Sequence, residues 1–143
     1  MTRIRVDTRL SAPPAAVWAD LRHIARHVEW MADAVSVMFT TESRQGVGTA
    51  FECRTKVGPL RLTDRMVVTV WEPPSVMGIR HQGAVTGRGQ FTLTPDGQGT
   101  RFTWEEELDF PWWLGGRLGG LIGAPLLRTV WRRNLAELRR RFA

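Results

Sequence analysis

The segment from Ala34 to Phe110 alternates between short strand-like runs and turn residues, and this constrains the fold more than any other feature. We expect strands at residues 34–41, 48–57, 60–71, 75–82, 86–94 and 100–110. The turns between them hold glycine or proline, as in Gly58-Pro59 and Pro95-Asp96-Gly97. Because a parallel crossover needs about a dozen residues or more, such short connections predict antiparallel neighbours.

The N-terminal region adds one strand and two short helices. In residues 3–10 the side chains alternate with the period of a half-buried strand. Ser11, followed by prolines 13 and 14, then predicts the start of a helix that ends around His23. A second short helix is expected to contain Val28, Trp30 and Met31.

A long amphipathic helix ends the chain. Its apolar stripe has spacings of three and four residues, and consists of Leu127, Trp131, Leu135, Leu138 and Phe142. Pro125 must either begin this helix or kink it. Glycines keep the preceding 113–124 stretch thin, and we expect its apolar surface to come from Trp112, Trp113, Leu114, Leu118, Leu121 and Ile122.

These elements predict one α+β domain over residues 1–143, in which a seven-stranded antiparallel sheet is wrapped around the C-terminal helix. The chain resembles the SRPBCC (START-like) superfamily, in its bacterial polyketide cyclase/dehydrase and lipid-transport-like branch. The resemblance covers the whole chain and rests on residues 11–18 (SAPPAAVW), 29–31 (EWM), 97–104 (GQGTRFTW) and the arginine-rich last helix. It implies a helix-grip fold with a deep hydrophobic pocket. Members include binders, carriers and a minority of enzymes, without a shared catalytic motif.

Charge and cysteine content narrow the partners and the compartment. The net charge is +6, and residues 128–143 alone hold six arginines and one glutamate. We interpret this as a solvated helix face, with weak membrane-surface contact as the alternative and no nucleic-acid partner. A single cysteine, Cys53, excludes an intrachain disulfide and is expected to be a small core residue. With no apolar N-terminal run and no stretch that could span a bilayer, we expect a cytoplasmic monomer or homodimer.

Motifs for metal, nucleotide and hydrolase chemistry are lacking. His23 and His27 have the i, i+4 spacing of a metal pair, but no third ligand accompanies them, so we expect surface histidines. There is no phosphate-binding glycine loop and no Gly-x-Ser-x-Gly elbow. We therefore predict no cofactor and no metal.

Alternation along each strand assigns side chains to the face that meets the helix. The inward residues are expected to be Phe51, Cys53, Thr55, Val57, Leu60, Leu62, Met66, Val68, Val70, Met77, Ile79, Phe102, Trp104 and Leu108. Matching apolar with apolar positions pairs residue 91 with 104, 93 with 102, 89 with 106, 79 with 89 and 81 with 87. Gly87 and Gly89 then lie side by side, which leaves volume that either a neighbour fills or a cavity occupies.

The same alternation brings three polar residues toward the helix. Glu106 and His81 share the inward face, and a carboxyl and an imidazole in an apolar pocket could orient a ligand or perform acid–base catalysis. A buried Glu106 should have a raised pKa or a partner such as His81 or an arginine, unless a β-bulge turns it outward. Asp64 is expected near the rim, paired with an arginine.

Three functions follow from these observations. The leading hypothesis is binding of a small hydrophobic molecule, such as a lipid or polyketide, by a carrier or sensor. The alternatives are a cyclase/dehydratase with His81 and Glu106 as catalytic candidates, and an adaptor that docks through its basic helix. The ligand-binding candidates are Trp30, Phe51, Met66, Ile79, His81, Gly87, Gly89, Phe91, Phe102, Trp104, Glu106, Leu108, Leu114, Leu118 and Ile122.

Overall fold

The computed structural model describes residues 1–143 and confirms the predicted order of elements. They are β1 (Thr2–Leu10), α1 (Pro14–Leu21), η1 (Ile24–Glu29), β2 (Ala34–Phe39), β3 (Ala50–Val57), β4 (Leu60–Glu72), β5 (Val76–Gln82), β6 (Thr86–Asp96), β7 (Gly99–Asp109), η2 (Trp112–Leu114) and α2 (Gly116–Arg141). The second short helix is a 3-10 helix, η1, and a 3-10 turn, η2, precedes α2.

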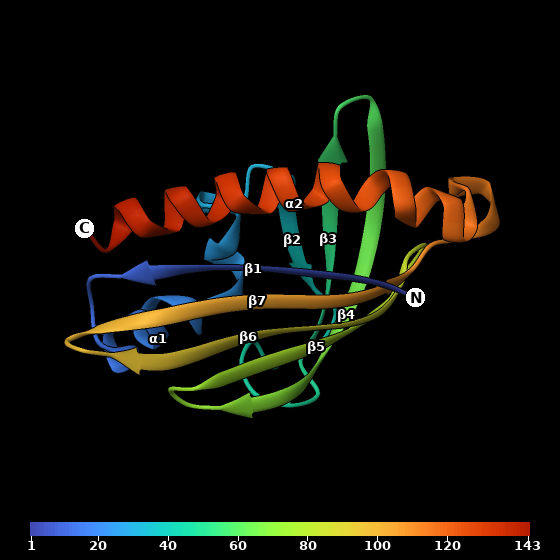
Figure 1. Ribbon diagram of the computed structural model, residues 1–143. Helices are drawn as coiled ribbons and strands as arrows, with labels where there is room; N and C mark the ends of the chain where they lie inside the picture. The colour runs from blue at the N-terminus through green and yellow to red at the C-terminus, as the bar shows by residue number, and fades with distance from the viewer.

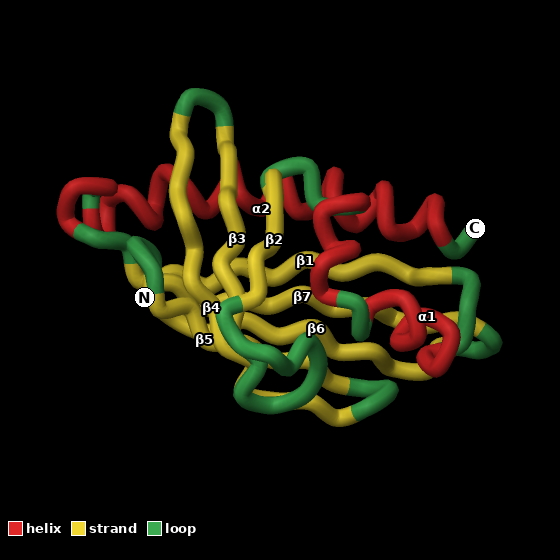
Figure 2. The backbone as a smooth tube through the Cα atoms, turned by 180° about the vertical axis from the view of Figure 1, so that it is seen from behind, coloured by secondary structure: helices red, strands yellow, loops and turns green.

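The seven strands form one antiparallel sheet in the order β1-β7-β6-β5-β4-β3-β2. The sheet curls around α2, with β1 and β7 running along one side of the helix and the β3–β4 hairpin rising past it (Figure 1). Seen from behind, α1 and η1 lie at the end of the sheet near the C-terminus (Figure 2). This is the predicted helix-grip arrangement.

The predicted strand register is confirmed. Phe91 pairs with Trp104 and Gly89 pairs with Glu106 in the β6–β7 hairpin. In the β5–β6 pair, Ile79 faces Gly89 and His81 faces Gly87. No register shift interrupts β7, so Glu106 stays on the inner face and the bulge alternative is wrong.

One β-bulge does occur, in β4 between Val68 and Val70. A bulge shifts the later side chains to the opposite face. Val70 therefore packs against Gly78 on the outer face instead of pointing inward as predicted. Trp71 turns inward in its place, where its ring meets that of Trp18 edge-on at 5.2 Å.

Aromatic rings fill the space between the sheet and the C-terminal half of α2. The indole of Trp30 meets Phe91, Phe102 and Trp104 at centroid distances of 5.9 to 6.3 Å. Trp104 stacks on Trp131 of α2 at 4.6 Å. Offset and edge-to-face contacts of this kind add to the stabilisation from buried apolar area. This end of the molecule is a dense core.

The two halves of α2 differ in what they turn toward the sheet. Trp131, Leu135 and Leu138 are buried as predicted. Four and eight residues before Leu127, the same helix face carries Gly123 and Gly119. The helix starts at Gly116 and continues through Pro125, so the proline does not begin it.

The expected apolar surface of the 113–124 stretch faces outward instead. Leu118 and Ile122 are 70% and 79% exposed. Trp112, Trp113 and Leu121 are exposed as well, whereas Leu114 is half-buried. The prediction was wrong because it did not continue the stripe of Leu127 and Trp131 toward the start of the helix. The positions one and two turns before Leu127 are glycines, and the leucines of this stretch lie on other faces. No helix of the chain is long and apolar enough to cross a membrane.

Polar contacts fix α2 to the N-terminal helices. The buried Asn134 accepts a hydrogen bond from the Ala32 amide at 3.0 Å and donates to Asp33 Oδ1 at 2.7 Å. Arg141 makes a bidentate pair with Asp20 of α1 at 2.8 to 3.1 Å. One arginine of the basic tail is therefore committed within the fold.

Candidate ligand-binding cavity

A cavity of about 290 Å³ lies between the inner face of the sheet and the N-terminal half of α2. Of its 33 lining residues, 22 are hydrophobic. Small-molecule sites in proteins are concave and mostly apolar, with volumes of roughly 300 to 1,000 Å³. The cavity has the composition of such a site and the size of a small one.

Ten of the fifteen candidate ligand-binding residues line the cavity. They are Phe51, Met66, Ile79, His81, Gly89, Phe91, Trp104, Glu106, Leu108 and Leu114. The strand alternation and the register place all of them except Leu114, which comes from η2. Their role toward a ligand remains a prediction.

The other five candidates lie elsewhere. Trp30 and Phe102 are buried within the aromatic core and contribute to its packing. Gly87 has a φ of +132°, and a Cβ there would clash with the Glu107 carbonyl, so the backbone and not the cavity requires glycine. Leu118 and Ile122 point away from the sheet.

The predicted empty volume at the glycines is filled by a neighbour. A Cβ on Gly89 would meet Oε1 of Glu106 first, because the glutamate side chain folds over that position. Glycine at 89 thus makes room for a carboxylate against the sheet. The open volume lies beside Gly123 of the helix, where a Cβ would meet nothing within 4 Å apart from its own helix. Gly119 also lines the cavity, but a Cβ there would clash with the Leu114 carbonyl, so the backbone requires glycine at that position.

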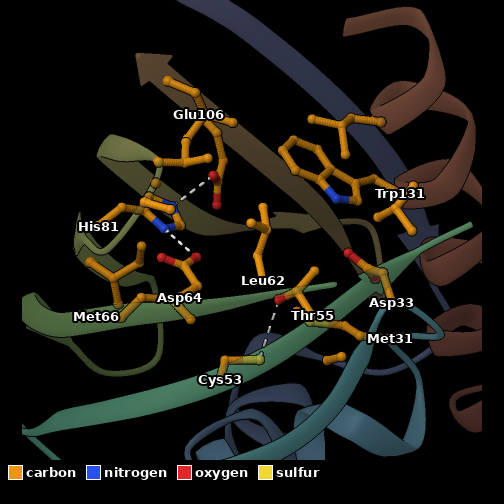
Figure 3. Close-up of a pocket in the computed structure, with 18 of the residues that line it drawn as sticks. Met31, Asp33, Cys53, Thr55, Leu62, Asp64, Met66, His81, Glu106 and Trp131 are labelled. Atoms are coloured by element: carbon orange, nitrogen blue, oxygen red, sulfur yellow. Dashed lines mark hydrogen bonds and ion pairs between the residues drawn. The ribbon is translucent and has the colours of Figure 1, made fainter. Parts of the chain in front are cut away.

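His81 joins two carboxylates on one wall of the cavity, as Figure 3 shows. Its Nδ1–H donates to Asp64 Oδ2 at 2.7 Å, and its Nε2–H donates to Glu106 Oε2 at 2.8 Å. The indole N–H of Trp104 donates to the other oxygen of Glu106 at 3.3 Å. The prediction that Glu106 has His81 as a partner is confirmed.

This arrangement favours the charged form of the imidazole. Burial lowers the pKa of His81, but the charge of Glu106 and the hydrogen bonds to Asp64 and Glu106 outweigh it and raise the pKa to about 10. At neutral pH the ring is an imidazolium that donates both of its N–H groups. The wall therefore carries two carboxylates and one cation.

The placement of Asp64 corrects the expectation of a rim residue paired with arginine. It shares its inward face with Leu62 and Met66, and its partner is His81. Its second oxygen, Oδ1, is buried and has no hydrogen-bond partner. This is a free acceptor in the wall that carries His81.

His27 and Cys53 also line the cavity, and burial shifts the pKa of each toward its neutral form. Burial lowers the pKa of His27 to about 4, although its Nε2–H donates to the Leu21 carbonyl at 2.7 Å. The expectation of a surface histidine is thus wrong for His27, because η1 turns the ring toward Trp30 and Phe91. Burial raises the pKa of the Cys53 thiol to about 11. No group of three ligating side chains could hold a metal ion.

Sequence reasoning missed Asp33, Met31 and Val37, which line the cavity at its other side. Asp33 lies between η1 and β2, outside any regular pattern, and contacts with distant residues position it. Its carbonyl accepts a hydrogen bond from the Lys56 amide at 2.8 Å, and its side chain accepts one from Asn134 of α2 at 2.7 Å. Asn134, next to Leu135 of the apolar stripe, could have indicated such a contact, since a buried asparagine requires hydrogen-bond partners.

Comparison with known proteins identifies the class of protein. The family model described as "Polyketide cyclase / dehydrase and lipid transport" matches residues 1–143, so the chain belongs to this family, within the SRPBCC-like superfamily. A search of the curated proteins finds no match.

Solved structures share the fold at low sequence identity. TTHA0849 from Thermus thermophilus is 18% identical, with a TM-score of 0.79 over 98% of this chain and 96% of that one. CV1439 from Chromobacterium violaceum is 16% identical, with a TM-score of 0.76 over 99% and 98%. The Zhui aromatase/cyclase from a Streptomyces species is 17% identical, with a TM-score of 0.66 over 94% and 87%. At these identities the likeness concerns the fold alone.

Proposed function

We propose that residues 1–143 act as one domain that binds a small, mostly apolar molecule, such as a lipid or polyketide, in the cavity. The observation that carries the proposal is Gly123 on the sheet-facing side of α2, where a Cβ would meet nothing within 4 Å apart from its own helix, while the stripe beyond it has large side chains. Interiors normally pack to the density of organic crystals. An apolar space kept open by the helix itself is suited to a ligand.

The driving force for binding would be removal of apolar surface from water, at about 25 cal/mol per Å². The His81 wall would orient a polar group of the ligand. Such a cavity serves a carrier or a sensor equally.

A cyclase/dehydratase function is less well supported. A general base needs a free lone pair within reach of the substrate. Both ring nitrogens of His81 are used as donors, to Asp64 and Glu106. The ring therefore has no lone pair to accept a proton, and we propose binding rather than catalysis as its role.

As a second proposal, the outer surface of η2 and of the N-terminal half of α2 contacts an anionic membrane surface. Trp112, Leu118 and Ile122 are exposed beside Arg117, and residues 112–128 contain no acidic side chain. Aromatic and aliphatic groups next to a basic residue suit the interface of anionic lipid. Sedimentation with vesicles that contain anionic lipid should decrease in Leu118→Asp/Ile122→Asp and at high salt. Unchanged sedimentation would contradict it.

Native mass spectrometry of the freshly purified protein tests the binding proposal. We expect one hydrophobic species per chain, which denaturing extraction removes and identifies. If the protein is empty, the neutral dye N-phenyl-1-naphthylamine should bind with enhanced fluorescence. An empty protein that also fails to bind the dye would overturn the proposed function.

A further inference from the structure

Acidic and basic side chains are distributed differently around the cavity. The chain has 20 basic side chains and a net charge of +6. None of these lysine or arginine side chains lines the cavity, whereas Asp33, Asp64 and Glu106 all do. A basic protein thus encloses an acidic cavity.

This distribution of acidic and basic groups follows from the alternation of side chains along the strands. Arg54, Arg65 and Arg80 each stand next in sequence to a lining residue, so they point to the outer face and are exposed. The basic groups of β3, β4 and β5 are therefore separated from the cavity by the sheet. They cannot pair with an anion that enters it.

The one cation in the cavity, the imidazolium of His81, already uses both of its N–H groups within the protein. His81 donates one N–H to Asp64 and the other to Glu106. It has no further N–H for the carboxylate of a ligand. The imidazolium offsets the charge of one of the three carboxylates that line the cavity.

What the cavity does offer is an acceptor. Oδ1 of Asp64 is buried without a hydrogen-bond partner. A buried acceptor without a donor is destabilising, and a donor supplied by a ligand would remove that cost. Hydroxyl and amino groups can supply one, and a carboxylate cannot.

We infer that the cavity takes a neutral or cationic apolar molecule that carries a hydroxyl or amino group, and that it rejects carboxylates such as fatty acids. The inference rests on the proposed function, because it names the ligand class for the same cavity. The donor of the ligand bonds Asp64 Oδ1 while its apolar part lies toward Gly123 and Trp131. A carboxylate would bring a further negative charge to a site of low dielectric constant, where like charges repel strongly.

Competition between ligands of one chain length tests the inference. The wild-type protein is loaded with N-phenyl-1-naphthylamine at neutral pH, and decanol, decylamine and decanoate are titrated against the dye. We expect decanol and decylamine to displace the dye at concentrations about tenfold or more below that of decanoate, a factor that corresponds to about 1.4 kcal/mol.

Two variants locate the cause of the selectivity. Asp64→Asn removes a charge inside the cavity with little change in size, and should raise the affinity for decanoate relative to decanol by about tenfold. Glu107→Gln makes the same change of net charge on the outer face, where Glu107 pairs with Arg3 and Arg88. It should leave the ratio unchanged.

The outcomes separate the inference from the proposed function. If decanoate displaces the dye as well as decanol and decylamine do in the wild type, the inference is wrong and the cavity still binds apolar ligands. If neither the dye nor any decyl compound binds, the proposed function fails and the inference with it. The wild-type comparison decides both even if the variants do not fold.

Discussion

The two ends of the space between the sheet and α2 are built differently. At the end near Trp30, the ring of Trp104 stacks on Trp131 and meets the ring of Trp30 edge-on. At the other end the same helix face carries Gly119 and Gly123, and polar side chains enter the wall of a cavity. One half of a single helix thus stabilises the fold, and the other half borders a cavity.

This difference shows how a small domain can contain a cavity. Burial of apolar area is concentrated in the packed end, with Phe102, Leu135 and Leu138 almost fully inaccessible. The hollow end then tolerates open volume and a buried charge cluster, both of which cost stability. The predictions below compare the two ends, from the largest expected effect to the smallest.

Truncation should be costly at the packed end and mild at the hollow end. Phe102→Ala should lower the free energy of unfolding by about 3–5 kcal/mol, because it leaves a void in a dense core. Leu62→Ala, in the cavity wall, should cost less than about 1 kcal/mol, since its side chain already borders open space. Urea denaturation of both variants measures the difference, and equal losses would contradict the distinction between the ends.

Removal of the cation from the hollow end should also be costly. His81→Gln leaves the carboxylates of Asp64 and Glu106 close together without a positive charge, and should cost about 3 kcal/mol at neutral pH. The loss should shrink at acidic pH, where one carboxyl can take up a proton. A loss that is the same at both pH values would indicate a packing effect instead.

The free energy of unfolding should be largest near pH 6.5, because the contribution of His81 is lost above this pH and that of His27 is lost below it. The pKa of His81 is raised to about 10, so its contribution is complete below pH 6.5 and is lost as the pH rises toward 10. The pKa of His27 is lowered to about 4, so its contribution is complete above pH 6.5 and is lost as the pH falls toward 4. Each slope is at most about 1.4 kcal/mol per pH unit.

Urea denaturation across this pH range checks both slopes. In His81→Gln the decrease in stability above pH 6.5 should be absent. The decrease toward pH 4, which belongs to His27, should remain but be less steep than in the wild type, because one of the two carboxyls near position 81 can take up a proton. A wild-type profile without the alkaline fall would contradict a charged His81 between two carboxylates.

Addition of a methyl group to the helix should be tolerated at the hollow end. A Cβ on Gly123 would meet nothing within 4 Å apart from its own helix. Gly123→Ala should therefore raise the free energy of unfolding by about 0.5–1 kcal/mol, through the helix propensity of alanine. A thermal melt compares it with the wild type, and a lower melting temperature would mean that this part of the helix is packed.

Much of the fold and part of the site could be predicted from the sequence. Period-two alternation and short turns determined the strands and their register, which brought Glu106 and His81 to one face and one wall. The bulge at Val68 and the rotation of the glycine half of α2 were not predicted. The bulge depends on how β4 and β5 pair around Val70 and Gly78, and local sequence does not encode that pairing.

The partner of Asp64 could not be predicted, because both nearby arginines and the more distant His81 could pair with its carboxylate. Arginines lie one and three residues from Asp64 in the sequence, at 65 and 61, but alternation turns them to the other face of β4. Only the pairing of β4 with β5 brings Asp64 within 2.7 Å of His81. Contacts between strands far apart in the sequence thus decided what the residue does.

The most direct test of the central claim is titration of N-phenyl-1-naphthylamine into two matched helix variants, Gly123→Trp and Ile122→Trp. Gly123 lines the cavity, and Ile122, its neighbour in the chain, is exposed. Our account predicts that the wild type and Ile122→Trp bind the dye equally, while Gly123→Trp fills the cavity and loses about tenfold or more in affinity. Equal binding by both variants, with both folded, would place the dye outside the cavity and contradict the account.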